Sequence, residues 1–219
     1  MATIPPDAPV TRSQVQQAAA QQFTPEGDSW GVLTDAREWS SAALSLPDDP
    51  AAWYQLAAAG GWQAVIADTC HPLAQDIVQS RNQGSAGLTA RWCSLPCAVP
   101  VLCAAASADG VRALQTAVAA ATAEGLPLQR TVVVFVSLGE GRLPTAVKTA
   151  MTMLDSRVAE VVSMPFEPQI RTGGGVHEAV RPKSRIELTT AVLASAHRSW
   201  GEPLPPAAEP APLRTPIPS

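Results

Sequence analysis

RTVVVFVSL, at residues 130–138, is a continuous run of apolar and mostly β-branched residues. A strand that is apolar at successive positions is buried on both faces, as in a parallel sheet covered by helices. Two further apolar runs, at 99–106 and 158–165, have the same character. The segments between them, 107–125 and 143–155, are rich in helix-forming residues and predict crossover helices. We therefore predict an α/β fold with a mostly parallel sheet and helices on both faces.

Further elements are predicted on either side of this centre. Residues 49–62 predict a helix that ends at Gly60-Gly61. QAVIAD, at 63–68, follows directly and predicts another buried strand. Helices are also predicted at 71–81 and 184–200, so strands and helices alternate along most of the chain.

The same patterns predict the domain organisation. We expect a single α/β domain over residues 28–200, in which 29–35 form a short strand or an extended edge. Residues 1–27 are expected to be an N-terminal extension, part of it helical within 11–23. Residues 201–219 are rich in proline, lack apolar periodicity and predict a disordered tail.

The composition excludes several classes of protein. The chain has 219 residues, 46% of them hydrophobic, which suffices for one good core. Its net charge of −4 provides no basic face for nucleic acid. The longest apolar runs are far shorter than the roughly 20 residues of a membrane-spanning helix. Residues 1–17 lack the apolar core of a secretory signal, so we expect a cytoplasmic protein.

The four cysteines do not predict a metal site. Cys93 and Cys97 have a C-x3-C spacing, but a zinc site needs a second pair of ligands, and only His71 is a loose candidate. Without a secretory signal, disulfides are not expected either. We expect buried or half-buried thiols at Cys70, Cys93, Cys97 and Cys103.

Candidate functional residues follow the predicted strands, because ligands of parallel α/β sheets bind at the carboxyl ends of the strands. The first of these ends carries Asp68 and Thr69. The next two carry Ser107 to Asp109 and Ser137 to Gly141. The last leads into MPFEPQIRTGGG, at residues 164–175.

Four segments that contain these strands and their carboxyl ends follow one another along the chain: WQAVIADT (62–69), PVLCAAASADGVRAL (100–114), RTVVVFVSLGEGRLPTAVKTAMTML (130–154) and VAEVVSMPFEPQIRTGGG (158–175). Their order and spacing resemble those of the MinD/ParA-like P-loop ATPases, in particular the divergent actinobacterial members. The resemblance extends over about residues 28–200.

The resemblance implies a P-loop-NTPase-like fold of MinD/ParA type and a nucleotide site at the strand ends. Asp68 matches the aspartate that lies near the magnesium-bound water in that family, and Thr69 follows it. Pro165, Glu167 and Pro168 match a loop that helps to enclose the adenine. The family typically works as face-to-face dimers, so the resemblance also implies a protein partner of related fold.

The chain departs from this family at the phosphate-binding loop. Such a loop presents backbone amides and a lysine to the phosphates and would be expected before residue 30. Residues 1–29 contain a single glycine, Gly27, and no lysine. The later Lys148-Thr149 is not a substitute, because Arg142 and Val147 occupy the positions where the loop needs glycine. We also expect Lys148 to lie beyond the first turn of its helix.

Two functions are weighed on these grounds, alongside an unrelated α/β fold. The first is a non-catalytic, pseudo-ATPase domain that acts as an interaction or regulatory partner, in a homodimer or with a full ATPase, and needs no cofactor. The alternative is a nucleotide-binding enzyme of MinD/ParA type that holds ATP and Mg²⁺ at an atypical phosphate site. An active hydrolase needs a cationic or amide-lined phosphate cradle.

Overall fold

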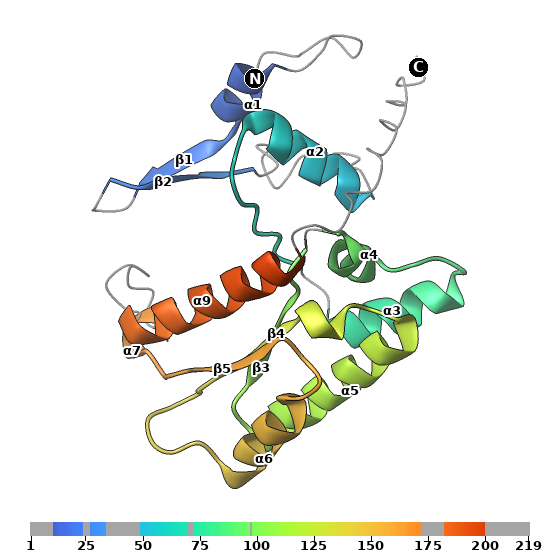
Figure 1. Ribbon diagram of the computed structural model, residues 1–219, viewed down its shortest axis with the longest axis vertical. Coiled ribbons are helices and arrows are strands. Elements are labelled where there is room, and N and C mark those ends of the chain that lie inside the picture. Colours follow the sequence, from blue (N-terminus) through green and yellow to red (C-terminus); the bar gives the residue numbers. More distant parts are fainter. Residues whose placement is uncertain are drawn as a thin grey trace, which may run out of the picture. The chain divides into compact units, whose positions relative to one another are not determined.

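The structure, a computed structural model, describes residues 11–23, 27–33, 49–69, 72–96, 98–171 and 182–199 (Figure 1). The described residues up to Asp68 form one compact unit, and those from Thr69 onward form a second. The residues expected to form a single domain over 28–200 are thus shared between two units. The tail expected at 201–219 lies outside the described residues.

The first unit contains two helices and a small antiparallel sheet. In chain order these are α1 (Arg12–Ala18), β1 (Ala20–Phe23), β2 (Ser29–Val32) and α2 (Pro50–Gly60), and β1 pairs with β2. The short strand and the second helix confirm the predictions for these segments. The helix expected within 11–23 ends early, because its last residues pair with β2, and this pairing outweighs their helix propensity.

Local signals in the sequence determine the ends of α2. The Asp49 carboxylate accepts a hydrogen bond from the Ala51 amide at 3.0 Å and so caps the start of the helix. Gly61 ends the helix in the left-handed conformation, with φ of 76°. The Gln16 side chain on α1 donates to the Gly60 carbonyl at 2.9 Å, which ties the two helices together.

The second unit contains a three-stranded parallel sheet. Its strands are β3 (Val101–Ala105), β4 (Val132–Val136) and β5 (Glu160–Met164), and β4 lies in the middle. Val132 pairs with Val101 on one side and with Glu160 on the other, so the three strands are in register. The predicted α/β fold with a mostly parallel sheet is confirmed.

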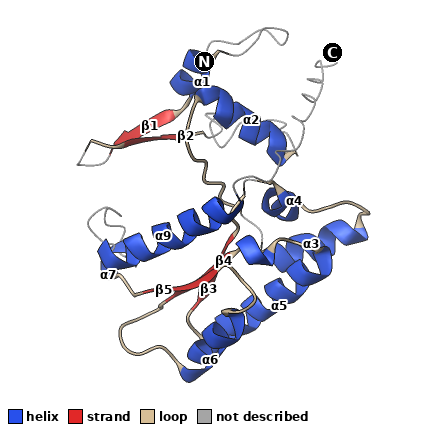
Figure 2. Ribbon diagram, in the orientation of Figure 1, coloured by secondary structure: helices blue, strands red, loops and turns tan. Residues whose placement is uncertain are grey.

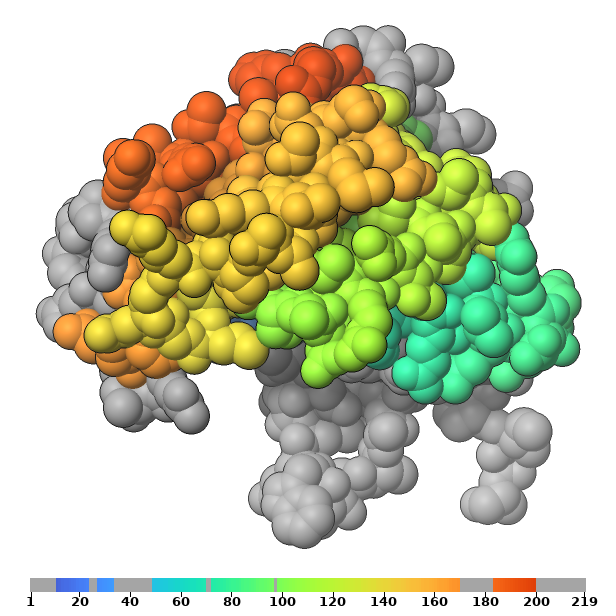
Figure 3. Space-filling model, turned by 90° about the horizontal axis from the view of Figure 1, so that it is seen from below, coloured from blue at the N-terminus to red at the C-terminus, as the bar shows by residue number. Residues whose placement is uncertain are grey.

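Helices cover both faces of this sheet (Figure 2). The first face is covered by α5 (Ala108–Glu124) and α6 (Thr145–Leu154), and the second by α9 (Pro182–Ser199). Beside α5 lies α3 (Leu73–Asn82), as the surface view shows, and α4 (Leu88–Ser94) packs on α3 (Figure 3). The connections include two short elements, η1 (Leu128–Arg130) and α7 (Pro168–Arg171).

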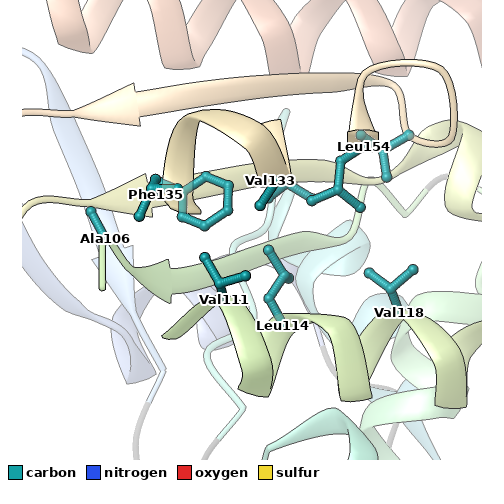
Figure 4. Packing of buried hydrophobic residues seen from close by; sticks show 10 residues of the cluster. Ala106, Val111, Leu114, Val118, Val133, Phe135 and Leu154 are labelled. Carbon is teal, nitrogen blue, oxygen red and sulfur yellow. The ribbon is translucent and has the colours of Figure 1, made fainter. Parts of the chain in front are cut away.

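The core is centred on β4. The side chains of Val133 and Phe135 face α5 and α6, where they pack with Leu114 and its neighbours (Figure 4). Val132 and Val134 belong to the opposite cluster, which they form with residues of β5 and α9. Because Val132, Val133 and Phe135 are all 0% exposed, this strand is buried on both faces as its sequence predicts.

The prediction of a strand at residues 63–68 was wrong. These residues follow α2 as irregular, exposed chain, and Ile66 is 96% exposed. A strand is stabilised by hydrogen bonds to a neighbouring strand, and no strand within the described residues pairs with this segment. Its apolar sequence indicates strand propensity but does not specify the partner.

A substitution of Gly110 tests how closely α5 packs on the end of β3. A Cβ atom at this position would lie 2.0 Å from the carbonyl oxygen of Ala105, which is backbone and has little freedom to move. We expect Gly110→Ala to lower the free energy of unfolding by about 2 kcal/mol, measured by urea denaturation. Gly139→Ala is the matched control, because nothing lies within 4 Å of a Cβ there. Equal stability of the two variants would contradict this packing.

Candidate functional site

The carboxyl ends of the three parallel strands form the candidate site. They lie along one edge of the sheet, which is where α/β proteins of this architecture bind ligands. The turns that leave the strands are tied to one another by backbone hydrogen bonds. The Ala106 amide donates to the Val136 carbonyl at 2.8 Å, and the Ser137 amide donates to the Met164 carbonyl at 2.9 Å.

The turn after β3 leads directly into α5. The Ser107 hydroxyl accepts a hydrogen bond from the Gly110 amide at 3.1 Å and caps the helix. Asp109 forms an ion pair with Arg112 within the first turn, and both side chains are exposed. The polar groups of this turn therefore serve the start of the helix.

The turn after β4 is longer and exposed. Gly141 adopts a φ of 117°, a left-handed conformation that favours glycine. Helix α6 begins at Thr145 after Pro144, and no side chain caps it. Lys148 is exposed, and its amide donates to the Pro144 carbonyl at 3.2 Å. Lys148 thus lies in the first turn of α6, and the expectation that it lies farther along was wrong because the helix starts later than expected.

The predicted adenine loop follows β5. Pro165 and Glu167 are half-buried, and Pro168 is exposed and begins α7. The structure thus places these three residues together at the carboxyl end of a parallel strand, as expected from the sequence. Their role toward a nucleotide stays a prediction.

Asp68 and Thr69 are not at the end of a strand. Both are exposed and belong to the irregular segment that follows α2. The aspartate position implied by the resemblance depends on a strand that this structure does not form. The role of Asp68 and Thr69 toward a nucleotide stays a prediction.

Cys93 lies beside a small apolar cavity and not in a ligand site. The cavity is about 10 Å³, room for one water at most. It is lined by Leu73, Cys93, Pro100, Leu102, Ala121, Leu126, Leu128 and Thr131. Burial, with a smaller contribution from the negative charge of Asp76, raises the pKa of the Cys93 thiol to about 11. A zinc site at Cys93 and Cys97 with His71 was not expected. Cys97 and His71 lie outside the described residues, as does Cys70.

A polar hollow of about 330 Å³ lies at the amino-terminal side of β5 and was not anticipated from the sequence. It brings together three distant segments of the chain, so no local motif marks it. Its lining is Gln129, Arg130, Val158, Ala159, Arg198 and Ser199. The two guanidinium groups are already engaged: Arg198 donates to the Ala159 carbonyl at 3.4 Å, and Arg130 donates to the Pro96 carbonyl.

Comparison of the chain with models of known protein families, with curated proteins and with solved structures found no match. Within the described ranges, no three His, Cys, Asp or Glu side chains gather closely enough to hold a metal ion. None of the helices in those ranges is long and apolar enough to cross a membrane.

The two described cysteines should differ in reactivity. Cys103 is exposed on β3, so the expectation of a buried or half-buried thiol was wrong there, whereas Cys93 is half-buried as expected and has a raised pKa. A raised pKa reduces the reactive thiolate fraction at pH 8, so we expect Cys93 to react with a thiol reagent at least about tenfold more slowly than Cys103. Peptide mapping of a labelling time course measures both rates, and unfolded protein is the control in which they should converge. Faster labelling of Cys93 in the folded protein would contradict its burial.

Proposed function

We propose that this chain is a non-catalytic, pseudo-ATPase domain of MinD/ParA type that acts by binding a protein of the same fold. The observation that carries the proposal is the exposed apolar surface at the exit of β4. Leu138 is 61% exposed and Val136, the last residue of the strand, is 39% exposed. Apolar side chains at the functional edge of a sheet favour burial against a partner.

The charges around Leu138 favour a second copy of the chain as that partner. Glu140 and Arg142 follow it in the same loop, carry opposite charges and are both exposed. In a two-fold symmetric contact each loop meets its own copy, so Glu140 of one protomer can pair with Arg142 of the other. Such a contact is consistent with the face-to-face dimers that the family resemblance implies.

The sequence speaks against hydrolysis by this chain alone. Residues 1–29 do not supply a Gly-Lys-Thr loop, and the chain contains only two lysines, Lys148 and Lys183. Asp68, the one candidate for orienting a magnesium-bound water, is exposed in irregular chain. A domain with these features would have the parallel sheet of such an ATPase but not the loop that binds the phosphates.

A nucleotide-binding enzyme is the second candidate, and Lys148 favours it. This lysine lies in the first turn of α6, just after the glycine-containing loop at the end of β4. A cation near the start of a helix, where amides are directed outward, is a chemistry suited to phosphate. In this alternative Lys148 would replace the missing loop, with ATP and Mg²⁺ as ligands.

Sedimentation of the full chain tests the first candidate. We expect a dimer at about 100 µM protein, and we expect Leu138→Gln to weaken dimerisation at least about tenfold, since a leucine buried in each protomer is lost. Met153→Gln is the matched control, because Met153 is similarly exposed, at 65%, but lies on α6. A monomeric wild-type chain, or equal effects of both substitutions, would contradict self-association through this loop.

A further inference from the structure

The polar hollow at the amino-terminal side of β5 has the composition of a small binding site. Its volume of about 330 Å³ lies within the range of about 300–1,000 Å³ that is usual for ligand pockets. Arg130, Arg198 and Gln129 line it, and Val158 and Ala159 supply the apolar part of the lining. Among the described residues, no acidic side chain contributes to this lining. Cationic groups beside an apolar surface suit an anion that carries a carbon skeleton.

Hydrogen bonds between the surrounding segments form the hollow in advance of any ligand. The hydroxyl of Ser195, a fully buried residue of α9, donates to the Arg130 carbonyl at 2.7 Å. The Ala159 amide, just before β5, donates to the Thr131 carbonyl at 2.8 Å. These bonds hold α9, η1 and the residues before β5 together. A ligand would therefore lose little free energy in ordering the site.

The charge of Arg198 is not compensated within the described part of the chain. Its side chain is exposed, and its guanidinium donates to the Ala159 carbonyl at 3.4 Å, which is a long hydrogen bond to a neutral acceptor. No described carboxylate lies within ion-pairing distance of Arg198. A guanidinium has several N–H donors, so most of those on Arg198 can bind an anion. Arg130, which donates to the Pro96 carbonyl, brings a second positive charge to the lining.

We propose that this hollow binds a small organic carboxylate and that Arg198 is its principal contact. A guanidinium can bind both oxygens of a carboxylate through two parallel hydrogen bonds. Val158 and Ala159 would contact the carbon skeleton of the same ligand. The inference does not depend on the proposed function, because the hollow lies before β4 and β5 begin, away from the carboxyl ends of the strands.

The position of the hollow favours a carboxylate over a phosphate. Arg198 and Ser199 are at the carboxyl-terminal end of α9, where the helix dipole carries a partial negative charge. This end of a helix repels a doubly charged phosphate more strongly than a singly charged carboxylate. Phosphate sites typically use the amides at a helix N-terminus instead, and none of the residues that line the hollow begins a helix other than the short η1.

A chemical-shift titration of the full-length, isotope-labelled chain with benzoate tests the proposal. Benzoate carries one carboxylate on an apolar ring, and benzamide is a neutral control of nearly the same shape. We expect benzoate to bind with a Kd of about 1 mM, as is usual for a small fragment, and to shift the amides of Gln129, Ala159 and Ser199. Benzamide should bind at least about tenfold more weakly, because it lacks the charge that Arg198 recognises.

A pair of substitutions on α9 tests the role of Arg198. Arg198→Gln should weaken benzoate binding at least about tenfold. Arg185→Gln is the matched control, because Arg185 is also exposed on α9 but does not line the hollow. Arg198 also offsets the negative end of α9, so its substitution should lower stability slightly, and urea denaturation checks that the variant is folded.

The comparison of benzoate with benzamide uses the wild-type chain and does not depend on either variant. No shifts up to about 20 mM benzoate, or equal binding of benzamide, would overturn the proposal. Equal effects of the two substitutions would overturn it too, because the binding would then reflect only the general charge of the chain. Tighter binding of inorganic phosphate than of benzoate would contradict the assignment of the ligand as a carboxylate.

Discussion

The burial of β4 on both faces is the constraint on which the second unit depends. Val133 and Phe135 require cover from α5 and α6, while Val132 and Val134 require cover on the side of α9. A strand with no polar face must lie inside a sheet and between layers of helices. Its two neighbours, β3 and β5, satisfy its backbone hydrogen bonds and are necessarily edge strands in the described sheet.

This arrangement explains where apolar side chains are exposed at the surface. The core is concentrated at β4, so apolar groups become exposed where the strand leaves the core, at Val136 and Leu138, and on the outer strand at Val101. The first of these surfaces lies at the edge of the sheet where related architectures bind ligands, and it is the surface proposed above to contact a second copy of the chain.

The sequence predicted the elements whose signals are local. Consecutive β-branched residues identified β4, and Gly60-Gly61 marked the end of α2, where Gly61 adopts the left-handed conformation. The predictions that were wrong depended on distant partners or on an exact start. Residues 63–68 have the composition of a strand, but a strand also needs a neighbour. Lys148 was misplaced because nothing in its helix caps the start, so the boundary was not defined by the sequence.

Calorimetric titration of the folded chain with ATP and Mg²⁺ tests the central claim, that the chain has kept the sheet of an ATPase and works without nucleotide. The account predicts no heat of binding up to about millimolar ATP, for the wild-type chain and for Lys148→Met alike. Binding at about micromolar ATP that Lys148→Met abolishes would contradict it, because Lys148 would then provide a phosphate site.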